Sequence, residues 1–208
     1  MSAVVRVAGD TTVPFAPGSP RCHKVTAMDI SYPLGLIRET RPYLAGAALI
    51  GGAILLHGAL RDAMLIAIML FAPMLDSYWR PPRLTRNWQN YLAWGVALLI
   101  MAGLLLLNRT LVVAWDVFSI LVAAIPEEWF FRAYLLERLG RTLRGNLIST
   151  ALFTLVHGLT RGPVTALLVI VPSLAYGWLY LKTRDVVLLA LVHALSNLIY
   201  LLYLKTFF

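Results

Sequence analysis

Three short polar motifs interrupt an otherwise apolar sequence in the second half of the chain. In each motif the named residues lie about one helical turn apart, and each motif contains at least one polar or ionisable side chain. The motifs are Glu127-Glu128-x-x-x-Arg132, Phe153-x-x-x-His157 and His193-x-x-x-Asn197. Carboxylates and imidazoles act as general bases, while histidine and asparagine side chains can stabilise charge that develops on a carbonyl oxygen. Ionisable groups in membrane-like segments are costly and normally face a bundle interior or a water-filled cavity. The motifs therefore predict a reactive polar site among helices.

The spacing of these residues on helices gives them different directions. At about 3.6 residues per turn, His193 and Asn197 share one helix face and can point at the same atom. Glu127 and Glu128 lie about 100° apart around their helix. Arg132 lies about 40° from Glu128 but about 140° from Glu127 by the same count. Arg132 can therefore neutralise Glu128 while Glu127 faces elsewhere, which suggests different roles for the two glutamates.

The elements that position these residues follow from composition. The chain has 208 residues, of which 60% are hydrophobic and 13% charged, and its mean hydropathy is +0.75. A soluble domain of this size is not so apolar or so poor in charge. Apolar runs of membrane-spanning length recur at 43–60, 62–79, 91–107, 110–137, 146–160, 163–181 and 186–204. The sequence predicts an all-α, polytopic membrane bundle of about seven spans, with the site among the fourth, fifth and seventh.

The N-terminal segment differs from the rest of the chain. Residues 1–40 contain four prolines and scattered polar residues, without the apolar core of a signal peptide. We expect them to form a disordered or surface-lying cytoplasmic leader, followed by a single transmembrane domain at 41–208 with the motifs inside 115–201. Cys22 is the only cysteine, so the sequence predicts no internal disulfide and no thiolate metal cluster.

The distribution of basic residues predicts the orientation. The net charge is +8, and lysines and arginines concentrate on the cytoplasmic side of membrane spans. With the N-terminus inside and seven spans, 14 of the 18 lysines and arginines fall on the inner side, and the outer side keeps only Arg61, Arg109, Arg161 and Lys205. The basic character thus reflects topology rather than nucleic-acid binding. The C-terminus is expected outside, and a prokaryotic inner membrane is the expected location.

The depth of the polar residues supports one shared site. We take inner boundaries near 138–141, 145 and 184 for the three helices that carry the motifs. Glu127, His157, His193 and Asn197 then lie roughly 14–21 Å from the inner face, at about 1.5 Å per residue. Three helices that are far apart in sequence thus bring their polar residues to one depth in the membrane.

Simpler roles remain open for individual residues. The Glu128–Arg132 pair can be a salt bridge and nothing more, and a single intramembrane histidine can be a hydrogen-bonded packing residue. Trp79 is expected in an aromatic belt at the membrane interface, together with Trp88 and Tyr91. It is the combination of the polar positions that favours a site.

Taken together, the motifs resemble those of the CAAX-protease and bacteriocin-processing (Abi) family of intramembrane glutamate proteases. The matching stretches are "EEWFFR", "STALFTLVHG" and "YGWLYLKTRDVVLLALVHALSN", within residues 115–201. The resemblance implies that Glu127 activates the attacking water with the help of His157. It also implies that His193 and Asn197 stabilise the oxyanion, and that Glu128 and Arg132 are a supporting pair.

The resemblance favours a metal-independent intramembrane endopeptidase without a cofactor. Its expected partners are the lipid bilayer and a protein or peptide with a membrane-associated segment, as in CAAX-like processing or sorting-signal cleavage. A zinc metalloprotease is an alternative, because two histidines and a glutamate are a plausible zinc set, although no His-Glu-x-x-His motif is present. A carrier or scaffold with a relic site is another, but a carrier is expected to show paired repeats with broken helices.

Overall fold

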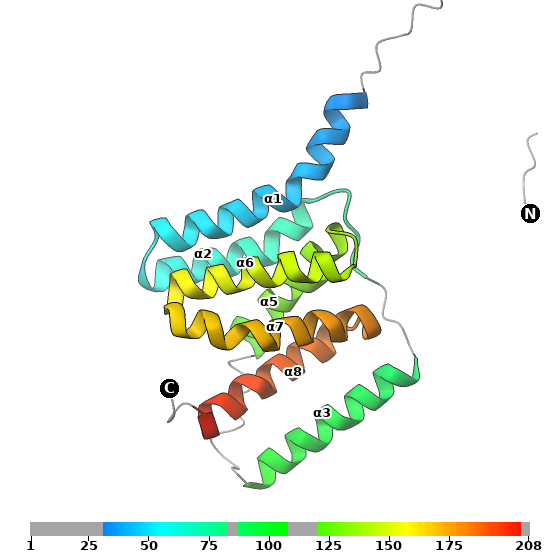
Figure 1. The fold of residues 1–208 in the computed structure, drawn as a ribbon, viewed down its shortest axis with the longest axis vertical. Coiled ribbons are helices and arrows are strands. Elements are labelled where there is room, and N and C mark those ends of the chain that lie inside the picture. The colour runs from blue at the N-terminus through cyan, green and yellow to red at the C-terminus, as the bar shows by residue number, and fades with distance from the viewer. Residues whose placement is uncertain (1–30, 83–86, 108–119, 205–208) are drawn as a thin grey trace, which may run out of the picture.

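The computed structural model describes residues 31–82, 87–107 and 120–204, and the regular secondary structure in these ranges is helical. The helices pack side by side as a bundle (Figure 1). Seven α-helices and no strand occur in the described part: α1 (Ser31–Leu55), α2 (Gly58–Leu75), α3 (Trp88–Leu107), α5 (Ile125–Glu128), α6 (Leu143–Arg161), α7 (Pro163–Thr183) and α8 (Val186–Ile199). Three π-helical segments complete them: η1 (Ile120–Ala124), η2 (Trp129–Leu136) and η3 (Tyr200–Leu204). The predicted all-α class is confirmed.

The described helices support a membrane protein but do not establish the number of spans. Two described helices, α2 and α7, are long and apolar enough to cross a membrane. The helices follow the predicted apolar runs closely, although α1 begins at Ser31, inside the segment expected to be a leader. The beginning of the fourth run, at 110–119, lies outside the described residues. Seven spans therefore stay a prediction.

The boundary between the first two helices lies earlier in the chain than predicted. Residues 56–57 separate α1 from α2, and Gly58 begins α2 with a φ of 60°, a conformation that favours glycine. The predicted apolar runs 43–60 and 62–79 put this boundary at residue 61, which is wrong, because Arg61 and Asp62 both belong to the first turns of α2. Their side chains pair with each other at 3.0 Å (Nε to Oδ1). Two opposite charges that cancel locally do not have to end a helix.

Local capping signals explain the tight turns around α7. Thr142 begins α6 by accepting a hydrogen bond from the Gly145 amide at 3.1 Å. Gly162 ends α6 with a φ of 95°, and Pro163 starts α7 at a position where no amide proton is needed. Asp185 then caps α8 by accepting from the Leu188 amide at 3.0 Å. The chain thus folds into an antiparallel α6–α7–α8 unit (Figure 1).

Close packing of α6 on α7 depends on a glycine. A Cβ built on Gly177 would overlap the side-chain amide of Asn146. That amide donates a hydrogen bond to the Leu174 carbonyl at 3.1 Å. Small residues let membrane helices approach closely, and here the missing side chain makes room for a polar contact between helices.

Trp79 is part of the core and not of an interfacial belt, so its predicted role is wrong. It is 7% exposed, and its indole Nε1 donates to the Ala133 carbonyl of η2 at 2.8 Å. Its ring also packs edge-on against Trp129 and Tyr134, with centroids 5.0 and 5.7 Å away. A buried indole needs an acceptor, and a backbone carbonyl of η2 supplies it. Trp88, by contrast, is 70% exposed, as expected for an interfacial residue.

Candidate active site

The helix that carries the two glutamates changes its winding around them. Only Ile125–Glu128 forms regular α-helix, and the π-helical segments η1 and η2 flank it. Pro126 contributes to this change because it has no amide proton to donate to the preceding turn. Such π-helical turns often occur at functional sites. They place Glu127 and Glu128 in the interior, where their exposed fractions are 7% and 0%.

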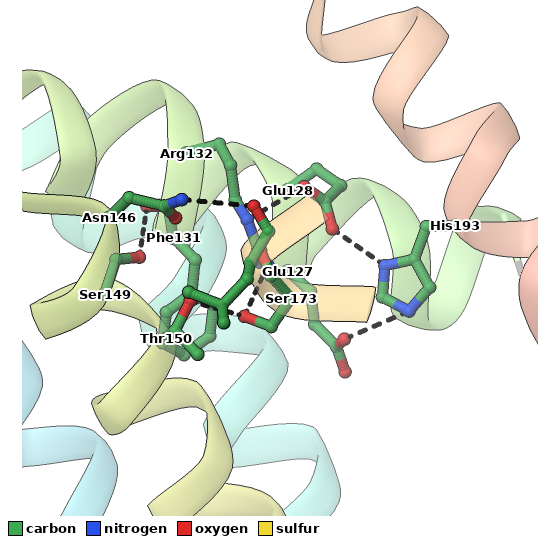
Figure 2. Close-up of polar contacts among 10 residues, drawn as sticks. Glu127, Glu128, Phe131, Arg132, Asn146, Ser149, Thr150, Ser173 and His193 are labelled. Atoms are coloured by element: carbon green, nitrogen blue, oxygen red, sulfur yellow. Dashed lines mark hydrogen bonds and ion pairs between the residues drawn. The ribbon is translucent and has the colours of Figure 1, made fainter. Parts of the chain in front are cut away.

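Glu128 and Arg132 form the ion pair that their spacing predicts. The Arg132 Nε lies 3.3 Å from Glu128 Oε2 (Figure 2). Its Nη2 donates to Ser173 of α7, at 2.8 Å to Oγ and 3.2 Å to the carbonyl oxygen. Ser173 Oγ donates in turn to Thr150 Oγ1 of α6 at 3.1 Å. The guanidinium, only 1% exposed, is thus held directly by groups from two elements, and Thr150 of a third supports Ser173.

His193 lies between the two glutamates. Its Nδ1 is 2.8 Å from Glu128 Oε1, and its Nε2 is 3.6 Å from Glu127 Oε2 (Figure 2). An ionised carboxylate can only accept, so Nδ1 carries a proton and donates it to Glu128. The Tyr176 ring stacks on the imidazole with centroids 5.1 Å apart and planes 29° apart. These contacts fix the ring so that Nε2 points toward Glu127.

His157 has a defined orientation too. Its Nδ1 is 3.0 Å from the Phe153 carbonyl oxygen, one turn earlier on α6. A carbonyl only accepts, so Nδ1 is the donor, and the neutral ring then presents an unprotonated Nε2. The Phe153 ring packs on the imidazole at a centroid distance of 4.2 Å. His157 is therefore equipped to accept a hydrogen bond at Nε2.

One cavity connects the predicted catalytic residues. It has a volume of about 450 Å³, and its lining includes Glu127, His157, His193 and Asn197. The supporting pair is absent from that lining, since Glu128 and Arg132 lie behind His193. Glu127 Oε2 is buried without a hydrogen-bond partner among the described residues. The structure thus brings the four residues to one cavity, while their chemical roles stay a prediction.

Several residues of the site carried no clear signal in the sequence. Ser173 and Thr150 hold Arg132, but lone hydroxyl residues in apolar helices usually bond to their own backbone. Tyr176 lies three residues after Ser173, so a polar face on α7 was the available clue. Arg161, assigned from the sequence to the outer flank only, also lines the cavity.

The described residues include no group of three or more histidine, cysteine, aspartate or glutamate side chains arranged to hold a metal ion. Within the cavity, His193 Nδ1 is bonded to Glu128, and His157 Nδ1 to a backbone carbonyl. Glu127 and His157 both line the cavity, so each can form a hydrogen bond with a small polar molecule that enters it.

Comparison with known proteins supports the resemblance seen in the motifs. No curated protein and no solved structure matches the chain. A family model does match, over residues 109–199, and its description is "Type II CAAX prenyl endopeptidase Rce1-like". The matched interval contains all three polar motifs and nearly all of the cavity lining. Residues 109–199 of the chain are therefore similar to the Rce1-like type II CAAX prenyl endopeptidases.

Proposed function

We propose that the protein is an intramembrane endopeptidase that hydrolyses a peptide bond with water activated by Glu127. Its substrate is a membrane-anchored or C-terminally tailed protein, cut near the membrane. The observation that carries the proposal is the shared cavity, in which the buried carboxylate of Glu127 meets His157, His193 and Asn197.

The Glu127 side of the cavity suits activation of water. Glu127 accepts a proton from the water as its oxygen bonds to the carbonyl carbon of the substrate. His157 Nε2 accepts a second hydrogen bond from the same water, because Nδ1 already donates to Phe153. Two acceptors direct the lone pair of the water toward the substrate. Glu127 later passes its proton to the leaving amine nitrogen as the C–N bond breaks.

The α8 side of the cavity suits stabilisation of the oxyanion. Asn197 has an amide donor on the same face of α8 as His193. His193 Nε2 faces Glu127 and the cavity, while Nδ1 is bonded to Glu128, so a proton carried on Nε2 points toward the substrate. At 3.6 Å from Glu127, Nε2 is too far away for a direct hydrogen bond to it. The Nε2 proton is therefore available to the oxygen of the substrate carbonyl.

A glutamine substitution tests the role of the base. Glu127→Gln keeps the shape of the side chain and removes its basicity, so cleavage should fall by at least about 10²-fold. Glu137→Gln is the matched control, because Glu137 lies near the end of the same helical stretch, outside the cavity lining, and pairs with Arg141 and Arg184.

The readout does not require a known substrate. The membrane proteome of a deletion strain is compared after complementation with wild type, Glu127→Gln or Glu137→Gln. Uncleaved precursors should accumulate with Glu127→Gln and disappear with the other two. If Glu127→Gln, present in the membrane at wild-type level, cleared the precursors at a near-normal rate, the assignment would be wrong.

A further inference from the structure

The cavity is open at one end and closed at the other. Its lining near the α6–α7 turn includes Arg161, which is exposed, and Thr165, which is half-buried, together with Tyr200, which is 37% exposed. At the opposite end the lining includes Tyr176, only 6% exposed, and behind it Arg132 is buried at 1%. Water and substrate therefore reach the site from the side of the α6–α7 turn.

Polar contacts show which helix ends lie together at the closed side. Asp76, just after α2, is 3.0 Å from Arg138 (Oδ2 to Nε), just after η2. Glu137 Oε1 is 3.1 Å from Arg184 Nη2, just after α7. Asn90, at the start of α3, donates to the Thr183 carbonyl at 2.9 Å. One side of the bundle, opposite the α6–α7 turn, thus contains the ends of α2 and α7 and the beginnings of α3, α6 and α8 (Figure 1).

The two sides differ sharply in charge. The closed side carries most of the described basic residues, including Arg41, Arg138, Arg141, Arg144, Lys182 and Arg184, and we call it the arginine-rich side. On the opposite side, the described basic residues are Arg61, which pairs with Asp62, and Arg161 at the cavity mouth. Arginine and lysine concentrate at the cytoplasmic ends of membrane helices. By this rule the arginine-rich side faces the cytoplasm.

We propose that the catalytic cavity opens to the outer side of the membrane and takes its substrates there. This inference rests on the proposed peptidase function and adds the class of substrate. The substrates are exported proteins that an apolar segment retains in the membrane, cut at the outer end of that segment. A protein anchored to the cytoplasmic face would have to cross the closed, arginine-rich side to reach Glu127.

The depth of the site agrees with entry from outside. His157 lies one turn before Arg161, so about 6 Å of helix separates it from the mouth. From Leu143, at the other end of α6, the distance is about 21 Å. An extended peptide advances about 3.3 Å per residue, so about two residues of substrate reach from the mouth to His157. The scissile bond is therefore expected within a few residues of the outer end of the apolar segment.

Cysteine accessibility tests the orientation without requiring proteolysis. Cys22 is the only cysteine, so Cys22→Ser provides a cysteine-free background. Pro163→Cys places a thiol at the exposed start of α7 on the mouth side, and Arg144→Cys places one at the exposed start of α6 on the arginine-rich side. A membrane-impermeant maleimide applied to cells or spheroplasts should label Pro163→Cys and should label Arg144→Cys only after permeabilisation.

Any other pattern overturns the proposed orientation. Labelling of Arg144→Cys before permeabilisation, or failure to label Pro163→Cys there, contradicts an outward opening. The two cysteine variants should show the same labelling when they also carry Glu127→Gln. The labelling therefore tests the orientation independently of the catalytic role of Glu127. The precursors that accumulate with Glu127→Gln check the substrate class. These precursors should be exported proteins. If all of them were proteins anchored to the cytoplasmic face, the inference would be contradicted.

Discussion

Removing the charge of Glu128 should affect stability and catalysis by separate routes. Glu128→Gln keeps an oxygen that can accept from His193 Nδ1 but leaves Arg132 without a carboxylate, at 1% exposure. Losing one partner of a buried ion pair typically costs about 3–5 kcal/mol. Ser173 continues to bind the guanidinium, so the expected cost lies near the lower limit, about 3 kcal/mol.

The stability effect is measurable as a change in the unfolding temperature. For a chain of this length, 1 kcal/mol corresponds to about 2–4 °C, so Glu128→Gln should lower Tm by about 6–12 °C in a fixed detergent. Glu137→Gln serves as the control again, because its charged partners Arg141 and Arg184 are partly exposed, and the glutamine oxygen can still accept from Tyr180. Such pairs contribute about 0–1 kcal/mol. Equal shifts for both variants would contradict the burial argument.

A second substitution separates the two roles of the pair. Glu128→Gln with Arg132→Met removes both charges, and a buried ion pair replaced by an apolar side chain is often neutral in stability. The double variant should regain most of the lost Tm. It should still cleave slowly, because His193 has lost the anion that holds its Nδ1 proton. Recovery of both stability and activity would show that the pair is structural only and would refute this role of Glu128.

Three further outcomes are expected. Asn197→Ala should lower the rate of bound-substrate cleavage by roughly 10²–10³-fold with little change in KM. His193→Ala should act similarly. The cleavage rate of the double variant should fall by less than the product of the two single effects, because both residues act on one oxygen atom. A raised KM with an unchanged rate would instead make Asn197 a docking residue. Gly177→Ala should lower stability by about 1–3 kcal/mol through overlap with Asn146, measured by thermal unfolding, and Asn146→Ala should relieve the overlap. Chelators should not inhibit the purified enzyme, and metal analysis should find no stoichiometric metal. A metal lost and restored together with activity would favour the zinc alternative.

The sequence predicted the helices well because their signals are local. Apolar length identified the helical stretches, and Gly162 followed by Pro163 marks the turn between α6 and α7. The ion pair of Glu128 with Arg132 followed from helical spacing alone. The gathering of the four candidate catalytic residues at one cavity agrees with their predicted depth, which depended only on residue counts along three helices.

The remaining features depend on contacts between distant segments. Trp79 binds the Ala133 carbonyl across 54 positions of sequence, and no composition rule separates such a residue from an interfacial tryptophan. Regular α-helical geometry placed Glu127 away from Glu128, but it did not show that both carboxylates approach His193. That arrangement depends on the α8 packing and the π-helical winding around α5, neither of which is encoded by spacing alone.

The local character of the Glu128–Arg132 pair has a consequence for membrane insertion during synthesis. A charged residue at the centre of an inserting helix costs about 2.5–3.5 kcal/mol on translocon scales. Glu128 and Arg132 are four residues apart, so they can neutralise each other within a single segment before α7 and α8 leave the ribosome. The contact of Glu128 with His193 spans 65 positions and forms only after α8 has been inserted. The helical stretch at residues 120–136 can thus enter the bilayer with two of its three charges already cancelled. Substitutions of Arg132 should therefore reduce the amount of inserted protein before they affect any chemistry.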